Sequence, residues 1–425
     1  MVNRKARRRT VARHGQLRSP RPLAQVLTAV GIAVAVVLVS GAGIVAFVGT
    51  TLITEVTADA VELEGHESVP PDIRAFEGGF NLLLTGVDTC EEKYAHLFDK
   101  RCTGADAEGT LNDVNMLVHV SDQPRRITAV SFPRDLMLRI PACAGEDGED
   151  FGGTGKGQLN TAYTAGGLNC VAKTISELTG QDIQFAAAVT FGGVIEITDA
   201  IGGVEVCLAS SIKDSHTGLD LDAGTHTVSG LTALQFLRTR HGLVGESDLA
   251  RIGNQQVYLN SLVRKLRADE TLGDVPTVLR LANTALSNLE ASTSLTNPML
   301  IAQIALAVKD VPFEDITFLQ YPVATDPDDP DRVVPIRSAG AALFEAIAAN
   351  QPLEITHRNS KFDGVVVEQG ETTAQPEPPA SPHPADSAAP TDAATPVPEQ
   401  TAVALPESVK GTTAEQRTCS NGNGR

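Results

Sequence analysis

An uncharged apolar stretch near the N-terminus constrains this chain of 425 residues more than any other feature. Residues 23–49 carry no charged side chain and are rich in Val, Ala, Leu and Ile. As a helix this stretch would be about 40 Å long, which exceeds the ~30 Å hydrocarbon core of a bilayer. A cleaved signal peptide is the alternative, because Ala58-Asp59-Ala60 has the small side chains of a cleavage site, but a signal core has only about 7–15 apolar residues. We therefore predict one transmembrane helix, a retained anchor over residues 23–50.

The charges on either side of this stretch indicate its orientation. Eight bases precede it, and the first acid of the chain is Glu55. Because basic flanks stay in the cytoplasm, we predict a basic cytoplasmic arm over residues 1–22 and an extracytoplasmic body after the anchor. The predicted localisation is the cell membrane, with a single pass and a cytoplasmic N-terminus. The eight bases are Arg4, Lys5, Arg7, Arg8, Arg9, Arg13, Arg18 and Arg21.

The body that follows is acidic. Since eight of the 34 bases lie in the arm, 26 bases remain against all 52 acids. A duplex-DNA reader needs a basic face to neutralise phosphates, and a single-strand binder needs aromatic platforms. The chain has no Trp and only 4% aromatic residues. We therefore expect no nucleic acid among its partners.

All six cysteines lie beyond the predicted anchor. An even number of cysteines in an exported body indicates disulfides. The sequence contains no Cys-x-x-Cys pair, the pattern that would indicate a zinc or redox site. Six cysteines allow fifteen pairings, and the sequence alone does not choose among them. Cys90 with Cys102, which closes a short loop, is the pairing we expect first, and Cys143 with Cys170 is the second. Cys419 suggests that the C-terminal end docks on the body.

The pattern of the body indicates its domain organisation. Residues 51–77 are polar and are predicted to form an extracytoplasmic stalk. Strands then alternate with helices over residues 78–350, which favours a layered α/β domain with a mixed central sheet. Residues 351–425 are rich in Pro, Ala and Thr, and we predict a largely disordered tail there. The expected strands are 80–85, 115–120, 126–132, 204–208 and 316–321, and the expected helices are 171–178, 193–200, 231–240, 247–267, 275–290, 298–308 and 339–349.

Arginine placement is the most informative feature of this acidic body. Guanidinium groups are permanently charged, fork-shaped donors that suit phosphate oxygens. Asp248, Arg251 and Gln255 are spaced by three and four residues, which places them on one face of a helix. A single surface arginine more often pairs with a nearby acid, and only several together would form a phosphate or pyrophosphate clamp. The arginines that could form such a clamp are Arg134, Arg238, Arg240 and Arg251.

Two aspartates lie near the ends of predicted strands. Asp88 follows the first strand, and Asp113 precedes the next one. Carboxylates at neighbouring strand ends could share a Mg²⁺ ion, which prefers oxygen ligands and keeps substrate phosphates in its shell. The alternative is that these aspartates cap turns or are solvated.

Five short motifs occur in a fixed order behind the predicted anchor. In this order they resemble the LytR–CpsA–Psr family of cell-envelope proteins, and its actinobacterial members most of all. The resemblance covers residues 80–266 well and extends more loosely to residue 349. The motifs are NLLLTGVD at 81–88, NDVNMLVH at 112–119, SFPRD at 131–135, LRTR at 237–240 and DLARIGNQQ at 248–256.

This resemblance implies a fold and an activity. The implied fold is a three-layer α/β/α sandwich with a deep apolar cleft. The implied activity is a Mg²⁺-dependent phosphotransferase that attaches a glycopolymer from a polyprenyl-pyrophosphate carrier to peptidoglycan in cell wall assembly. By resemblance, the catalytic residues are Arg134, Arg238, Arg240, Asp248 and Arg251, the substrate-binding residues are Arg134, Arg238, Arg240, Arg251 and Gln255, and the metal ligands are Asp88 and Asp113.

Two departures from the family pattern leave other functions open. Cys90 stands where members commonly carry Arg, and Leu111 and Val114 stand near Asp113 where members commonly carry Arg and Thr. Two candidate phosphate contacts are therefore missing. The alternatives are a hydrolase that cleaves polyprenyl pyrophosphate with water, and a non-catalytic envelope scaffold that binds a glycolipid.

Overall fold

The computed structural model describes residues 61, 63, 79–98, 102, 110–145, 150–268, 275–358, 364–367 and 402–424. The predicted cytoplasmic arm and anchor lie outside these residues, as does all of the predicted stalk except Val61 and Leu63. In the described part of the chain, no helix has the length and apolarity needed to cross a bilayer. Val61 and Leu63 do contact the body: Val61 N–H donates to Ala291 O over 3.0 Å, and Leu63 is buried in the core.

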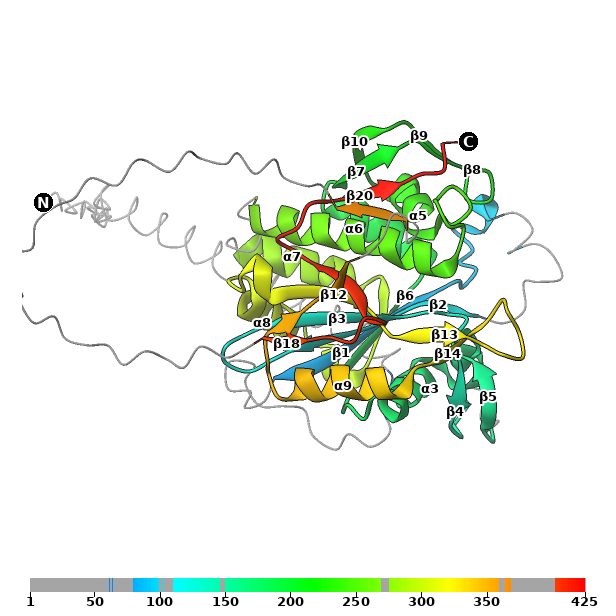
Figure 1. Ribbon diagram of the computed structural model, residues 1–425. Coiled ribbons are helices and arrows are strands. Elements are labelled where there is room, and N and C mark those ends of the chain that lie inside the picture. Colours follow the sequence, from blue (N-terminus) through cyan, green and yellow to red (C-terminus); the bar gives the residue numbers. More distant parts are fainter. Residues whose placement is uncertain are drawn as a thin grey trace, which may run out of the picture. The chain divides into compact units, whose positions relative to one another are not determined.

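An eight-stranded mixed sheet forms the centre of the fold (Figure 1), in the order β11-β6-β1-β2-β3-β12-β19-β16. β2 runs antiparallel to its neighbours β1 and β3, β6 runs parallel to β1, and β12 runs parallel to β3. It follows that β1, β3, β6 and β12 end at the same end of the sheet, where β2 begins. The strands are β1 (Phe80–Val87), β2 (Asn112–Val120), β3 (Ile127–Phe132), β6 (Phe185–Val189), β11 (Leu289–Ala291), β12 (Ile316–Gln320), β16 (His357–Arg358) and β19 (Lys410–Thr413).

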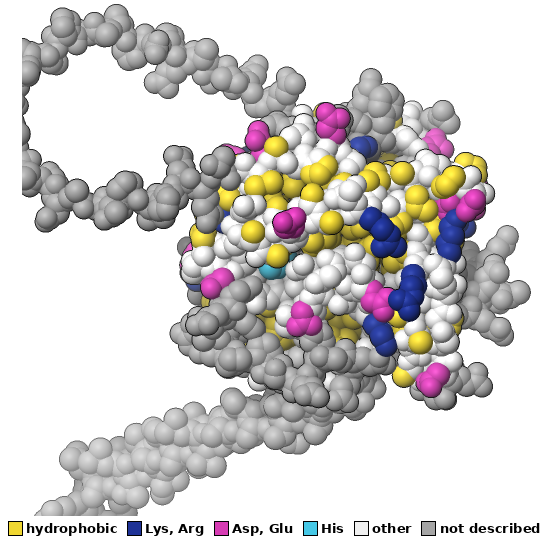
Figure 2. Space-filling view, turned by 60° about the horizontal axis from the view of Figure 1, so that its bottom comes forward, with side chains coloured by type: hydrophobic (Ala, Val, Ile, Leu, Met, Phe, Trp, Pro, Cys, Tyr) yellow, Lys and Arg dark blue, Asp and Glu magenta, His cyan; other side chains and the backbone are white. Residues whose placement is uncertain are grey.

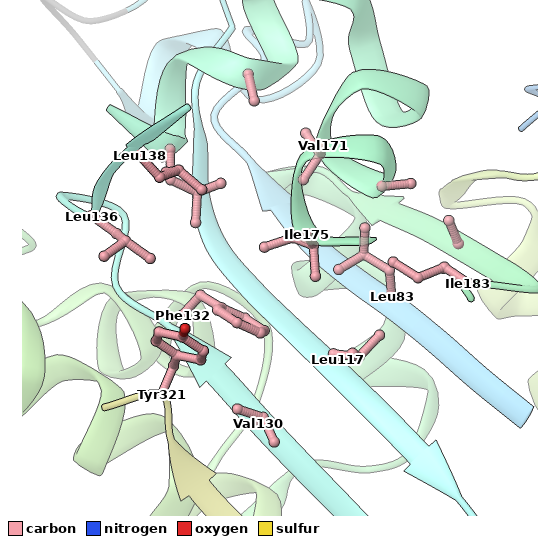
Figure 3. Packing of buried hydrophobic residues seen from close by; sticks show 14 of the residues in the cluster. Leu83, Leu117, Val130, Phe132, Leu136, Leu138, Val171, Ile175, Ile183 and Tyr321 are labelled. Atoms are coloured by element: carbon pink, nitrogen blue, oxygen red, sulfur yellow. The ribbon is translucent and has the colours of Figure 1, made fainter. Parts of the chain in front are cut away.

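One face of this sheet packs against α3 (Ala162–Thr179) and α9 (Arg337–Ala348). Figure 3 shows Leu83, Leu117 and Val130 of the sheet facing the side of α3 that carries Ile175. On β3, Val130 and Phe132 are two residues apart, and on α3, Leu168, Val171 and Ile175 recur at spacings of three and four, so each element buries one face.

The other face packs against a second group of helices. Alternate residues of β1, Leu82 and Leu84, point to this face and join a cluster with Leu286 and Ile301. Helices therefore cover both faces of the sheet, which confirms the expected layered α/β fold with a mixed central sheet. The helices of this second group are α4 (Phe191–Ala200), α5 (Gly230–Arg238), α6 (Asp248–Ala268), α7 (Val275–Leu286) and α8 (Pro298–Val308).

The surface at the bottom of Figure 1 comes forward in Figure 2. Hydrophobic side chains form a broad band across this face, and most acidic side chains stand singly. Lys and Arg side chains gather toward the right of the view. The acidic charge of the body is thus not concentrated on this face.

The C-terminal end differs from the tail that the sequence predicts over residues 351–425. β19 joins the central sheet beside β12, and β20 (Thr418–Asn421) lies between β7 (Val204–Ser210) and β17 (Val365–Val367) in a four-stranded sheet completed by β10 (Gly224–Val228). The domain therefore extends beyond residue 350. Its last strands, KGTT and TCSN, are short and polar, so hydrophobic alternation did not reveal them. Residues 368–401 lie outside the described part.

Short strand pairs complete the fold. They are β4 (Met137–Ile140) with β5 (Thr154–Gln158), β8 (Ile212–Asp214) with β9 (Leu219–Leu221), β13 (Val323–Thr325) with β14 (Val333–Pro335), and β15 (Leu353–Glu354) with β18 (Val403–Ala404).

Three disulfides join the cysteines in the structure. Cys90–Cys102 and Cys143–Cys170 confirm the two pairings expected from the sequence. The third bridge, Cys207–Cys419, attaches β20 to β7 and confirms that the C-terminal end docks on the body.

We predict that this third bridge stabilises the fold measurably. Replacing its cysteines by Ser, as Cys207→Ser/Cys419→Ser, should lower the free energy of unfolding by about 2–4 kcal/mol, because the bridge restricts the unfolded chain over a long loop. Urea denaturation of wild type and variant under oxidising conditions measures this difference. An unchanged urea midpoint would show that β20 docks without help from the bridge.

A buried histidine predicts a pH dependence of stability. His119 lies in β2, its Nδ1 is 2.8 Å from Asn81 Oδ1, and burial lowers its pKa to about 4. As the pH falls below about 6.5, the unfolded chain takes up this proton before the folded chain does. The contribution of His119 to stability is therefore fully present above pH ~6.5 and is lost as the pH falls toward 4. The loss from this residue is roughly 3 kcal/mol at most.

The variant His119→Gln should remove this contribution, because Gln stays neutral over the whole range. Urea denaturation at pH 7 and pH 4.5 should show a smaller loss of stability in His119→Gln than in wild type. The exposed His96 supplies the control, since His96→Gln should keep the wild-type difference. Equal losses in wild type and His119→Gln would contradict the assignment.

Candidate functional site

Three predicted site residues meet because of strand direction. Asp88 follows β1 directly, Asp113 lies at the start of β2, and Arg134 lies just after β3, so the antiparallel pairing brings them to one end of the sheet. Asp113 is the extra residue of a bulge, since Gly86 pairs with Val114 and the next residue of β1 pairs with Asn112. Such a bulge redirects a side chain at the edge of a regular ladder.

Asp88 is held in place by the backbone of the neighbouring strand. Its N–H donates to Leu111 O over 3.1 Å, and its Oδ1 accepts from Leu111 N–H over 2.7 Å. The side chain is only 7% exposed. Asp88 thus has a fixed position after the end of β1, bonded to the residue that precedes β2.

Asp113, Arg134, Asp248 and Arg251 form a chain of ion pairs. Arg134 Nη1 donates to Asp113 Oδ1 over 2.9 Å, and the N–H of Arg134 donates to Asp248 Oδ2 over 3.2 Å. Arg251 Nη2 lies 2.5 Å from Asp248 Oδ1 and donates to Asp113 O over 2.8 Å. These contacts tie the start of α6 to the ends of β2 and β3.

Helix α6 begins where the sequence predicts. Ser247 Oγ accepts from Ala250 N–H over 3.2 Å, which confirms the expected N-cap. One turn beyond Arg251, Gln255 Nε2 donates to Leu237 O over 3.0 Å and so joins α6 to the end of α5. The predicted face of Asp248, Arg251 and Gln255 is therefore the face turned toward the site.

Arg238 is held by aromatic rings. Its guanidinium carbon lies 4.3 Å from the ring centre of Phe191 and 5.5 Å from that of Phe98. Within the described residues it forms no ion pair with a carboxylate. Burial lowers the pKa of Arg238, and the charge of Asp113 opposes this shift.

Arg240 is set apart from the other three arginines. Its Nη2 lies 3.0 Å from His241 Nε2, and its N–H donates to Asp214 Oδ2 over 3.0 Å. Its described contacts thus anchor the loop after α5, and none of them joins it to Asp113 or Asp248. Of the four arginines expected to form a clamp, the structure thus groups three, namely Arg134, Arg238 and Arg251.

The charges of the cluster shift the pKa values of its members. Burial lowers the pKa of Arg134, but Asp113, Asp248 and Asp135 outweigh this effect, and the net shift is upward. Burial raises the pKa of Asp135, with a further contribution from the charge of Asp248, although nearby guanidiniums oppose it. Asp135 is fixed by Arg332 Nη1 at 2.9 Å.

A deep apolar cavity of about 470 Å³ opens beside this cluster. It lies between the sheet and α4–α8, and Asp113, Arg238, Arg251 and Gln255 supply its polar end. The cavity therefore matches a ligand with a long apolar part and an anionic head. Its apolar lining includes Leu84, Met116, Val189, Phe191, Val194, Ile197, Ile201, Leu234, Leu237, Leu259, Leu262, Leu266, Leu281, Leu289 and Ile301.

Asp88 and Asp113 are a donor set that suits Mg²⁺ together with a phosphate ligand. No group of three or more His, Cys, Asp or Glu side chains in the described chain is arranged to hold a metal alone. Mg²⁺ needs only one or two protein carboxylates when substrate phosphates and water complete its shell. The two aspartates therefore fit the ion on this chemistry.

Some residues of the site were not predicted from the sequence. Phe98 and Phe191 hold Arg238, and Asp135 extends the acidic partners of Arg134. Tyr258 lines the cavity, is 4% exposed, and its hydroxyl has no hydrogen-bond partner within the described residues. Only Asp135 left a sequence signal, since it is the last residue of the SFPRD motif.

Comparison with known proteins shows which proteins this chain is similar to. Cell wall biosynthesis protein LcpA of Corynebacterium glutamicum is 28% identical over 313 residues, which are 69% of this chain and 59% of LcpA. The polyisoprenyl-teichoic acid–peptidoglycan teichoic acid transferase TagT of Bacillus subtilis is 25% identical over 266 residues, 60% of this chain and 74% of TagT. The chain thus spans less than two thirds of LcpA.

A solved structure shows the same fold. Protein gbs0355 of Streptococcus agalactiae superposes with a TM-score of 0.50 and 20% identity, over 64% of this chain and 87% of that one. The LytR_cpsA_psr family matches residues 49–340, which is more than half of the chain. The protein therefore belongs to the LytR_cpsA_psr family, as the order of its five motifs indicates.

Proposed function

We propose that this protein is a phosphotransferase that moves a glycopolymer from a polyprenyl-pyrophosphate carrier onto a hydroxyl of peptidoglycan. One observation carries the proposal: Arg238 and Arg251 line the polar end of a deep apolar cavity together with Asp113, and Arg134 is bonded to that aspartate. A lipid diphosphate has the same division into an apolar chain and an anionic head. The names of LcpA and TagT, a cell wall biosynthesis protein and a transferase, support the same class of reaction.

The apolar part of the donor would occupy the cavity. Along α6, Leu259, Leu262 and Leu266 recur at spacings of three and four and line one wall. The cavity size falls in the range of small-molecule sites, which is about 300–1,000 Å³. Burial of isoprenoid units there would supply binding energy in proportion to the area removed from water.

The diphosphate would complete the hydrogen bonding of the arginines. Arg134 Nε and Arg251 Nε are buried and have no hydrogen-bond partner in the described part of the chain. Buried donors of this kind are costly when unpaired, and phosphate oxygens are strong acceptors. Arg238 adds a guanidinium that forms no ion pair with a carboxylate among the described residues.

The balance of charges gives a reason for a divalent cation. Four carboxylates (Asp88, Asp113, Asp135 and Asp248) face four guanidiniums (Arg134, Arg238, Arg251 and Arg332), so the site has no excess positive charge for a diphosphate. We propose that Asp88 and Asp113 hold Mg²⁺, which when bound neutralises phosphate charge. The arginines would then align the head group.

The reaction requires alignment more than covalent help from the protein. The oxygen of the peptidoglycan hydroxyl would bond to the phosphorus that carries the glycopolymer. The bond from that phosphorus to the bridging oxygen would break, and polyprenyl phosphate would leave with the electron pair as the hydroxyl releases its proton. Arg134, Arg238 and Arg251 would stabilise the charge that develops on the phosphate oxygens.

We further propose that residues 23–50 anchor the protein in the cell membrane, with the domain on the outer side. The carrier lipid stays in the bilayer, so an anchored enzyme meets it at a high local concentration. To test this topology, cysteines are introduced into the basic arm and into the domain, and the cysteines are then labelled in intact cells.

The transferase proposal predicts the effect of Arg238→Gln. Removing a charge that stabilises the transition state should lower the turnover of transfer by about 10²-fold. The assay offers full-length protein in detergent a lipid-pyrophosphate donor and peptidoglycan, and detects attached polymer. Arg139→Gln is the matched control, because Arg139 is an exposed arginine paired with Glu177. Equal turnover of Arg238→Gln and wild type would contradict the proposal.

The products of the same assay separate the alternatives. Free phosphorylated glycan without attachment would indicate a hydrolase that uses water as acceptor. Bound donor with no turnover, even with added Mg²⁺, would indicate a glycolipid-binding scaffold.

The metal proposal predicts a loss of transfer when the ion is removed. A chelator should reduce transfer at least about 10²-fold, and added Mg²⁺ should restore it, because the carboxylates would otherwise repel the diphosphate. Asp88→Asn should raise the Mg²⁺ concentration for half-maximal activity roughly tenfold, as expected for loss of a ligand. Full activity in chelator would exclude this role for Asp88 and Asp113.

A further inference from the structure

We propose that Phe98, which lies on the loop closed by the Cys90–Cys102 disulfide, is a positioning residue that aims Arg238 at the diphosphate. This inference rests on the proposed function, since it names the residue that orients one of the binding groups. It is carried by the contacts of the loop with α4 and by the absence of a carboxylate partner for Arg238 among the described residues.

The disulfide loop is attached firmly to α4. Cys90 and Cys102 lie 5.4 Å apart at Cα. Gly192 N–H, in the first turn of α4, donates to Glu91 Oε2 over 2.7 Å, and a negative charge at this end of a helix is favourable. Tyr94 OH forms a hydrogen bond with Glu196 on the same helix.

The close approach of the loop depends on a glycine. A Cβ atom at Gly192 would lie 2.1 Å from Glu91 Oε2 and 2.4 Å from the ring of Tyr94, closer than real Cβ contacts. The helix therefore has no side chain where the loop docks. This leaves room for Glu91 and Tyr94 against α4. Beside them on the same loop, Phe98 packs against Phe191 with 5.0 Å between the ring centres.

The two rings form the surface on which Arg238 lies. Leu234, one turn before Arg238 on α5, packs into the same cluster with Phe191 and Phe98. An aromatic face attracts a guanidinium through its quadrupole and leaves the positive charge intact. A carboxylate partner would fix the guanidinium equally well, but it would cancel the charge that a diphosphate needs.

Phe98 can be separated experimentally from the cavity itself. Phe191 lines the apolar cavity, so its replacement would alter the binding of an apolar chain as well as the position of Arg238. Phe98 contacts Arg238 and Phe191 but is not among the residues that line the cavity. A change at Phe98 should therefore affect recognition of the diphosphate and leave recognition of the chain unchanged.

The test compares two probes that share one apolar chain, farnesyl diphosphate and farnesol. Binding to full-length protein in detergent is measured by calorimetry with Mg²⁺ present. Phe98→Leu, which keeps an apolar side chain but removes the ring, should weaken farnesyl diphosphate binding roughly three- to tenfold. Farnesol binding should not change, and Phe98→Tyr should restore diphosphate binding because it restores a ring.

Another aromatic–arginine contact in the chain supplies a matched control. Phe313 lies 4.1 Å from the guanidinium carbon of Arg267 and 5.2 Å from that of Arg264, and none of the three lines the cavity. Phe313→Leu should therefore bind both probes as wild type does. Cys90→Ser/Cys102→Ser, which opens the loop without changing a ring, should weaken diphosphate binding in the same direction as Phe98→Leu.

The outcomes distinguish this inference from the proposed function. If wild type does not bind farnesyl diphosphate, the proposed function falls and this inference falls with it. If wild type binds it and Phe98→Leu binds equally well, only the role of Phe98 is overturned. Equal weakening of farnesol and farnesyl diphosphate would also overturn it, because that result indicates a general disturbance of packing.

Discussion

The ion pairs among Asp113, Arg134, Asp248 and Arg251 are the interaction on which the site depends. They join the start of β2, the segment after β3 and the first turn of α6, three parts of the chain that only the fold brings together. Partly buried ion pairs repay their desolvation only when further hydrogen bonds satisfy the same groups. Here backbone groups of Asp113 and Arg134 supply those bonds, so any shift of one strand end would disturb all four side chains.

Arg238 shows a different way to hold a charge at the same site. The paired arginines are neutralised by their aspartates, whereas Arg238 is fixed by Phe98 and Phe191 and keeps its charge. Burial acts against that charge and lowers its pKa, so a bound anion would relieve an unfavourable state. The polar end of the cavity thus combines a rigid, neutral frame with one cation that lacks a carboxylate partner.

Much of this could be predicted from the sequence because the relevant signals were local. The spacing of Asp248, Arg251 and Gln255 places them on one helical face whatever the tertiary structure, and Ser247 is a local cap. Other features depended on contacts between distant segments. The side chain of Arg240 contacts His241 instead of the ion-pair cluster. The polar strand β20 is placed by its pairing with β7 and by the disulfide at Cys419, and these two contacts leave no periodic pattern in the sequence.

The structure also shows which contacts are made at the two positions that depart from the family pattern. At Leu111 the backbone holds Asp88 through its N–H and its C=O, and these two hydrogen bonds do not require a particular side chain at this position. Cys90 is bonded to Cys102, and the loop it closes brings Phe98 to Arg238. Neither position adds a cation, so the four guanidiniums of the site only balance its four carboxylates. A site with this balance should depend more strongly on a divalent cation for binding a diphosphate than one with additional arginines.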